Sequence, residues 1–466
     1  MTNKFTSPIL DSIRNKCLED DLDLVHRYAL EYVNSVDEMP VFPKEKTIDD
    51  LNIFDEALGD EPQETRDIIN QLHTYGSPAT VAQTGRRYFG FVCGGILPSA
   101  LASKWLTDVW DQNPAMHVLS PIASKIEAVT ERWIVDLLGL PKETVAGYVS
   151  GSSTATIIGL TTGRNYLLHK AGYDIFQKGL PDAPHIKVVL GEGAHSTVYK
   201  ALSIIGLGSD CAAKVQVDEQ GRMDVDKLPE LDANTLLILQ AGHVNSGNFD
   251  DFETLCNLAK EAGAYVHVDG AFGLWAAANQ KFDHLTRGVQ MADSWSVDGH
   301  KTLNTPYDSG IILCKHEKTL IDSMHMTGSY IILSDARDNM LYTAEMSRRA
   351  RAIDLWATLK GLGKTGVSEL VWELHQKAVY FADLLEKGGL EVLNDVVFNQ
   401  ILVRFQTDDM TNTLIQNIQK SGICWIGGGK WEGKAVMRIS VCSYKTTYED
   451  IDLSVSDILR LAIKLK

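Results

Sequence analysis

The segment SWSVDGHKTLNTPYDSGIILC, residues 294–314, sets a lysine between a polar turn and an apolar run. Lys301 follows the turn Asp298-Gly299-His300, and the residues after it lead into the strand-like run SGIILC. Similar β-branched runs alternate with helix-like segments upstream: IKVVL (186–190), TLLILQ (235–240) and AYVHVD (264–269). This alternation predicts an α/β fold with a mostly parallel sheet and helices on both faces. Ligands bind such sheets beyond the carboxyl ends of the strands, so the residues after each run are the site candidates.

An aspartate and a histidine stand after two of these runs. HVDGAFG (267–273) places Asp269 at the end of an apolar run, and GEGAHSTVYKA (191–201) places His195 in a loop that opens a helix. Taken singly, such an acid ordinarily caps a turn and such a histidine is ordinarily incidental. A pyridine ring that serves as an electron sink, however, needs a protonated nitrogen, and a nearby carboxylate keeps that proton in place. An imidazole stacks well on such a ring.

A phosphate site is indicated by YVSGSSTATIIGL (148–160), a Gly/Ser/Thr turn that runs into an apolar helix. The backbone N–H groups, the hydroxyls and the positive end of the helix dipole suit a phosphate, although such a turn is also an ordinary helix cap. Together the four segments offer a phosphate cradle, a stacking histidine, a partner for a ring nitrogen and a lysine for a Schiff base. This combination indicates pyridoxal 5′-phosphate (PLP) chemistry.

Further motifs extend the pattern from about Arg87 to about Asp450. They are RYFGFVCGG (87–95), SPIASKIEAVTERWIVDLLGLP (120–141), SGSSTAT (150–156), AHSTVYKA (194–201), NSGNFDDF (245–252), DGHKTLNTPYDSG (298–310), SRRARAIDLWATLKGLG (347–363) and MRISVCSYKTTYED (437–450). On these motifs the chain resembles the fold type I PLP enzymes. More narrowly, it resembles the group II amino-acid decarboxylases, which include the aromatic-L-amino-acid, histidine, glutamate and cysteine-sulfinate enzymes.

The resemblance implies roles for individual residues. Lys301 would form the internal aldimine, Asp269 would pair with the pyridinium nitrogen, and His195 would stack on the ring. The cofactor-binding positions are completed by Ser152, Ser153, Asn245, Asp298 and His300. The family often has asparagine where this chain has Asp298, and a carboxylate beside a phosphate is repelled unless it is hydrogen-bonded or turned away.

The reaction implied is decarboxylation of an L-amino acid to its amine and CO₂. Tyr330, in the segment 326–339, matches the family's proton donor from the partner subunit; from its composition that segment is either a mobile lid or a static surface loop. An aminotransferase, an aldehyde-forming oxidative decarboxylase or deaminase, and a carbon–carbon lyase are the alternatives. A non-catalytic relative is disfavoured, since Lys301, Asp269 and His195 are all present.

Substrate recognition is expected at Gly94, Gly95 and His117. The two glycines either leave room and bring N–H groups to an anionic side chain, or form a tight turn. His117 and Trp110 lie in WDQNPAMHVLSP (110–121), which the resemblance assigns to the neighbouring subunit. The small residues favour an acidic or small polar substrate over an aromatic one. The arginines at 348, 349 and 351 are interpreted as structural ion-pair formers rather than anion binders.

Composition limits the partners. The 466 residues carry a formal net charge of −17, which disfavours nucleic acid and anionic membrane as partners and leaves a small molecule as the expected ligand; the resemblance implies that this molecule is an amino acid. Seven scattered cysteines predict neither a zinc site nor a disulfide framework, and with no signal-like or membrane-spanning segment they favour the cytoplasm. The expected organisation is an N-terminal helical arm (1–86), a large PLP-binding α/β domain (87–343) and a small α+β domain with its linking helix (344–466), in a homodimer with active sites at the subunit interface, as the resemblance implies.

Overall fold

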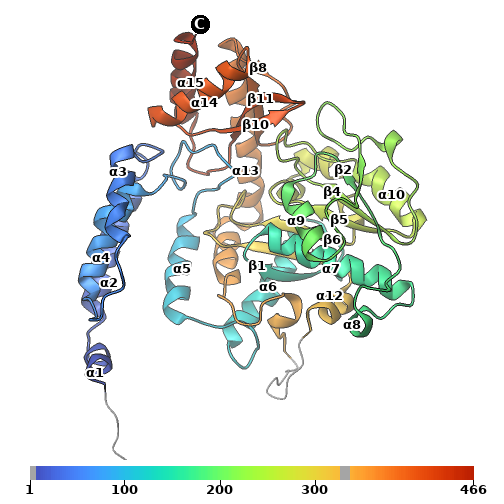
Figure 1. The fold of residues 1–466 in the computed structure, drawn as a ribbon, viewed down its shortest axis with the longest axis horizontal. Coiled ribbons are helices and arrows are strands. Elements are labelled where there is room, and N and C mark those ends of the chain that lie inside the picture. Colours follow the sequence, from blue (N-terminus) through green and yellow to red (C-terminus); the bar gives the residue numbers. More distant parts are fainter. Residues whose placement is uncertain (1–6, 326–335, 466) are drawn as a thin grey trace, which may run out of the picture.

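The computed structural model describes residues 7–325 and 336–465, and its centre is a seven-stranded sheet (Figure 1). The strands run in the order β1-β7-β6-β5-β4-β2-β3. Their bounds are β1 Val145–Val149, β2 Lys187–Gly191, β3 Ala213–Val215, β4 Thr235–Gln240, β5 Tyr265–Asp269, β6 Ser294–Asp298 and β7 Gly310–Cys314. The four apolar runs quoted above correspond to β2, β4, β5 and β7.

The prediction of a mostly parallel sheet is confirmed, with β7 as the exception. β7 pairs antiparallel with both β1 and β6, whereas the other neighbouring strands are parallel. The connection from β6 to β7, residues 299–309, contains no helix and is too short for a parallel crossover. Lys301 therefore lies in a tight connection at the carboxyl end of β6.

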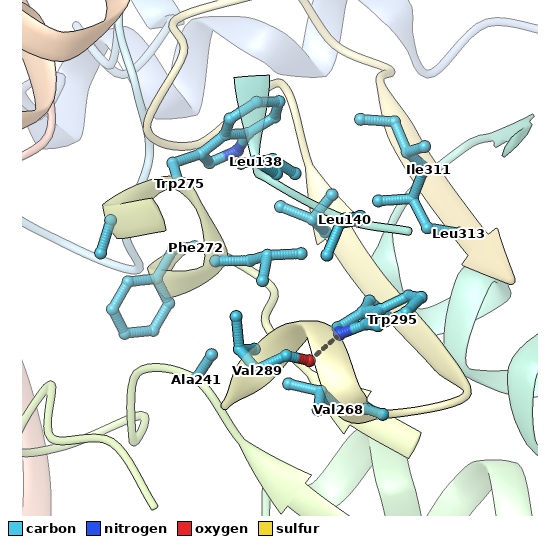
Figure 2. Packing of buried hydrophobic residues seen from close by; sticks show 14 of the residues in the cluster. Leu138, Leu140, Ala241, Val268, Phe272, Trp275, Val289, Trp295, Ile311 and Leu313 are labelled. Carbon is cyan, nitrogen blue, oxygen red and sulfur yellow. Dashed lines mark hydrogen bonds between the residues drawn. The ribbon is translucent and has the colours of Figure 1, made fainter. Parts of the chain in front are cut away.

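Helices cover both faces of this sheet (Figure 1). Leu237 and Leu239 of β4 pack with α6 (Pro121–Leu137), α10 (Phe252–Ala262) and α13 (Ala352–Lys387). Leu236 and Ile238 of the same strand pack with α7 (Ser152–Lys170) and α9 (Ser196–Ile204), because alternate residues of a strand point to opposite faces. Figure 2 shows the first of these clusters, in which the buried Trp295 indole donates to Val289 O at 2.9 Å. The helices are α5 Pro98–Trp110, α6 Pro121–Leu137, α7 Ser152–Lys170, α8 Ile175–Lys178, α9 Ser196–Ile204, α10 Phe252–Ala262, α11 Asp283–Thr286, α12 Glu317–Met324 and α13 Ala352–Lys387.

A smaller antiparallel sheet follows α13, in the order β10-β11-β9-β8. It comprises β8 Glu391–Val392, β9 Gln400–Arg404, β10 Gly427–Trp431 and β11 Lys434–Ser440, with α14 Asp408–Ser421 and α15 Tyr448–Ile463. The linking helix, expected from about residue 344, begins only at Ala352, so Arg348, Arg349 and Arg351 lie before the helix. We retain the boundary at 343/344 as a proposal.

The N-terminal arm consists of α1 Pro8–Arg14, α2 Glu19–Ser35, α3 Glu45–Asp49 and α4 Thr65–Gln71. In Figure 1 it extends along one side of the molecule (blue), next to α5. The arm exposes many apolar side chains, among them Leu18, Leu22, Leu30 and Val33. Within the described residues, no helix is both long and apolar enough to cross a membrane.

Candidate active site

The candidate residues gather where the parallel strands end. Asp269 is the last residue of β5 and Asp298 the last of β6, which is the neighbouring strand. His195 is the N-cap of α9, shortly after β2 ends at Gly191. Since the carboxyl ends of parallel strands meet at one edge of a sheet, the topology brings these separated segments together.

Polar residues replace the apolar ones on a single face of β5 and β6. His267 and Asp269 of β5 share the face toward α7, and the buried His267 ring bonds through Nδ1 to Ser294 Oγ of β6 at 2.8 Å. Ser296 of β6 contacts Thr156 of α7, Oγ to Oγ1, at 3.0 Å. The other faces of these strands carry Val266, Val268, Trp295 and Val297. On these two strands one face is therefore apolar, whereas the other directs polar groups toward α7, and Asp298 reaches the first residue of that helix.

Asp269, His195 and Lys301 lie within electrostatic reach of one another. Burial raises the pKa of Asp269, and the charges of His195 and Lys301 oppose that rise. Burial likewise lowers the pKa of His195, against the attraction of Asp269 and with the repulsion of Lys301. The Asp269 carboxylate accepts one backbone hydrogen bond, from Ala271 N at 3.2 Å, and no side-chain donor of the described residues reaches it. A buried carboxylate with so few donors is suited to a cationic N–H group.

Asp298 makes the strongest set of contacts in the site. It is 1% exposed and accepts from Ser152 N at 2.5 Å and from Ser152 Oγ at 2.7 Å, so it caps the start of α7. Its Oδ2 is also 3.1 Å from Lys301 Nζ and 3.6 Å from His300 Nε2. A carboxylate beside a phosphate is repelled unless it is hydrogen-bonded or turned away, and the Asp298 carboxylate is hydrogen-bonded. Both Ser152 donors are directed at it.

The remaining donors at the start of α7 fit a phosphate. Ser153 is exposed, and its hydroxyl has no partner among the described residues. Gly151, the N-cap of α7, lies beside His300 and Asp298, and a Cβ there would be 3.4 Å from His300 Cε1. With the Lys301 amine, the under-bonded Asp269 and the His195 ring, this set fits PLP.

His300 is held in place from two sides. Its Nδ1 accepts from Ser309 N at 3.1 Å, and its ring stacks on Tyr307 with centroids 4.3 Å apart. Burial lowers the pKa of His300. The Tyr307 hydroxyl bonds in turn to Cys93 Sγ at 3.5 Å. Tyr307 and Cys93 were not among the residues singled out from the sequence.

Gly94 and Gly95 lie against the Lys301 loop. A Cβ on Gly94 would be 2.1 Å from Lys301 O, so only glycine allows this approach. The Gly95 N–H donates to Asn304 Oδ1 at 2.7 Å and is therefore already used within the protein. Neither glycine has a left-handed backbone, whereas Phe91 and Val92 just before them do, with φ of 51° and 57°. Positive φ is uncommon for aromatic and β-branched residues and marks local strain next to the site.

Two cationic or titratable residues were also missed. Arg438 of β11 is half-buried, has no ion-pair partner among the described residues and acts electrostatically on His195. Its guanidinium lies 6.0 Å from the centroid of the Phe91 ring. His243, after β4, accepts from Asn245 N at 3.2 Å, and burial lowers its pKa to about 4. An arginine inside the apolar motif MRISVC was the one available signal for Arg438.

Other candidates are less closely connected. Asn245 bonds through its backbone to His243, and no described contact joins its side chain to Lys301. His117 donates its backbone N–H to Asp338 Oδ1 at 2.9 Å, and its Nδ1 is buried without a hydrogen-bond partner. Tyr330 lies outside the described residues, as does most of the segment 326–339.

The three arginines before α13 form ion pairs, as interpreted from the sequence. Arg348 binds Glu127 at 2.8 Å, with both side chains 1% exposed. Arg349 binds Asp354 at 2.6 Å, and Arg351 binds Asp308 at 3.2 Å. These contacts connect the start of α13 to α6 and to the loop after Lys301.

Comparisons with known proteins identify the family and the fold. The family described as "Pyridoxal-dependent decarboxylase conserved domain" matches residues 48–406. An aromatic-L-amino-acid decarboxylase of Bacillus atrophaeus is 23% identical, over 94% of this chain and 92% of the relative. The acidic amino acid decarboxylase GADL1 of Xenopus tropicalis is 24% identical, over 97% and 94%. The crystal structure of TDC from Oryza sativa with PLP and tryptamine superposes with a TM-score of 0.88 at 20% identity, covering 99% of each chain, and supports the fold.

Proposed function

The chain belongs to the pyridoxal-dependent decarboxylase family and catalyses PLP-dependent decarboxylation of an amino acid, and on this premise we propose that Lys301 is the residue that bonds to the cofactor. The observation that carries the proposal is the grouping of Lys301, Asp269 and His195 at the carboxyl ends of β6, β5 and β2. The family match favours decarboxylation over the aminotransferase, aldehyde-forming and lyase alternatives.

When bound, PLP would supply an electron-poor ring that accepts the electron pair left on the substrate carbon as CO₂ departs. Asp269 keeps a proton on the ring nitrogen through its buried, under-bonded carboxylate. His195 would hold the ring from one face, and burial lowers the pKa of its imidazole, which favours the neutral form. Ser153, with the backbone N–H groups at the start of α7, binds the phosphate.

Asp298 and Ser152 have a supporting role at the same place. The two hydrogen bonds that Ser152 donates to Asp298 fix the start of α7, and the 3.1 Å contact between Asp298 Oδ2 and Lys301 Nζ holds the amine near that helix end. We assign His300 and Asn245 to the rim of the cofactor site. Tyr330 is the proposed proton donor to the carbon that loses its carboxylate.

We propose an acidic or small polar amino acid as substrate. One support is the Arg438 guanidinium, which has no described ion-pair partner and lies within electrostatic reach of His195. A half-buried cation without a carboxylate partner attracts an anionic group, which in every amino acid includes the α-carboxylate. The preference for an acidic or small polar side chain therefore rests on the small residues Gly94, Gly95 and Ala115. Gly94 and Gly95 are proposed to contact the substrate, as is His117 of the segment assigned to the neighbouring subunit.

We propose a homodimer with active sites at the subunit interface, in the cytoplasm. Exposed apolar residues on α2 and α5, among them Leu30, Val33, Trp105 and Val109, support an interface between copies. All seven cysteines are free, which is compatible with a reducing compartment. Sedimentation equilibrium tests the dimer, and a monomer at micromolar concentration would contradict it.

The test of function compares the wild type with Lys301→Ala after addition of PLP. The wild type is expected to show a near-visible absorption band and to release CO₂ from one or a few of twenty amino acids; Lys301→Ala loses both. Lys315→Ala is the matched control, because Lys315 also pairs with an aspartate and is 22% exposed against 21% for Lys301, yet follows β7 at the opposite sheet edge. A band that survives in Lys301→Ala would refute the assignment. Assays for keto acid, aldehyde and ammonia check the alternative reactions.

A further inference from the structure

Asn304 lies three residues after Lys301 and is completely buried. Its backbone is left-handed, with φ of 56°, a conformation that asparagine tolerates better than most residues with a side chain. Its N–H donates to Lys301 O at 3.0 Å and closes the turn that begins at the lysine. The backbone position of Lys301 is therefore coupled directly to Asn304.

The Asn304 side chain uses every hydrogen-bonding position of its amide. The Nδ2 group donates to Thr302 O and to Cys442 O, each at 2.9 Å. The Oδ1 atom accepts from Gly95 N at 2.7 Å and from Tyr444 N at 3.0 Å. An asparagine amide offers two donors and two acceptor positions, so none remains unused.

These bonds join three parts of the chain that are distant in sequence. Gly95 belongs to the segment that passes over Lys301 O, where a Cβ on Gly94 would be 2.1 Å away. Cys442 and Tyr444 follow β11, the strand that carries Arg438. The Asn304 backbone carbonyl adds a further bond, from Leu97 N at 3.0 Å, just before α5.

We propose that Asn304 is a positioning residue for the decarboxylation, which fixes the Lys301 turn against the Gly94–Gly95 segment and against the end of β11. The inference rests on the proposed role of Lys301. A buried amide satisfied on all sides allows one arrangement of the three segments, because moving any of them leaves a buried polar group without a partner. The distance from the Lys301 amine to the substrate groups near Arg438 is set through this residue.

The experiment uses Asn304→Gly and Asn304→Asp in the full-length enzyme. Glycine keeps the left-handed backbone but removes the amide. Aspartate keeps the shape but turns a carboxylate oxygen toward the carbonyls of Thr302 and Cys442. In both variants the circular dichroism of the cofactor band is expected to fall to less than half of the wild-type value, and kcat to fall about 10- to 100-fold, as for a small misplacement of a reacting group. KM is expected to change less than kcat.

A second measurement does not depend on the bound cofactor. Reductive methylation of the cofactor-free protein, read for Lys301 by peptide mass spectrometry, reports how the amine is presented. Its rate is expected to differ at least threefold between each variant and the wild type. Should one variant fail to fold, the other still gives both readouts.

Asn394→Ala is the matched control. Asn394 is also a buried amide that joins segments, accepting from Leu402 N at 2.8 Å and donating to Ser246 O at 2.8 Å, but it makes no described contact with the Lys301 turn. This control is expected to lose stability and to retain the dichroism and the methylation rate. Asn304 variants that lose only stability, with dichroism and methylation as in the wild type, would overturn the inference. A band that persists in Lys301→Ala would instead refute the proposed function.

Discussion

Gly94→Ala tests how closely the segment before α5 must approach the reactive lysine. The added Cβ would lie 2.1 Å from Lys301 O and 3.2 Å from His300 O, whereas ordinary contact begins at 3.4 Å. The Lys301 carbonyl or the 91–95 segment must therefore move by about 1.3 Å. Neither moves easily, because Lys301 O accepts from Asn304 N and Gly95 N donates to Asn304 Oδ1.

A displacement of this size affects both catalysis and folding. Misplacing a reacting group by about 1 Å costs on the order of 100-fold in rate, or about 2.7 kcal/mol of activation free energy. Overpacking a buried site costs about 1–3 kcal/mol of the free energy of unfolding. We expect kcat to fall about 100-fold, measured as CO₂ release from the amino acid that the substrate panel identifies. We also expect the free energy of unfolding in urea to fall by about 1–3 kcal/mol.

Gly76→Ala is the control for this substitution. Gly76 has a helical backbone, with φ of −79° and ψ of −50°, and a Cβ there would meet nothing within 4 Å. Its replacement is expected to leave kcat unchanged and to leave stability unchanged or raise it by about 0.4–1 kcal/mol. If Gly94→Ala matched Gly76→Ala in both kcat and unfolding free energy, the close approach at Lys301 would have no mechanical consequence and the reasoning would be wrong.

Two further predictions concern stability. Arg348→Met is expected to lower the free energy of unfolding in urea by about 3–5 kcal/mol, because it leaves the 1%-exposed Glu127 carboxylate without its partner; a double replacement of both residues by methionine should recover most of the loss, and an additive double variant would contradict this. For His243, burial lowers the pKa to about 4, so between its ordinary value near 6.5 and pH 4 the unfolded chain binds the proton and the folded chain does not. Stability from this group is therefore present above pH 6.5 and is lost as the pH falls toward 4, by about 3 kcal/mol. His243→Asn keeps an acceptor for the Asn245 N–H and does not titrate. The unfolding free energy of this variant should therefore fall less between pH 7 and 4.5 than that of the wild type. Parallel plots of unfolding free energy against pH for the two proteins would count against a buried neutral imidazole.

The segments of the site were readable from the sequence, because their signals are local. The apolar runs of β2, β4 and β5 predicted a mostly parallel sheet, and their ends pointed to His195 and Asp269. A run of apolar residues and a polar turn each depend on neighbours within a few positions, so composition reveals them. The motif set likewise led to the correct family and cofactor.

Only the tertiary structure decided how these segments meet. The direction of β7, the capping of α7 by Asp298, and the amide of Asn304 bonded to Gly95 and Cys442 all join residues far apart in the chain. Such contacts follow from how strands are ordered and how closely backbones approach, and neither property leaves a periodic signal near the residue itself. Arg438 entered the site for the same reason: the motif MRISVC shows only an arginine inside an apolar run, and it is β11, in a second sheet, that carries this arginine to the site.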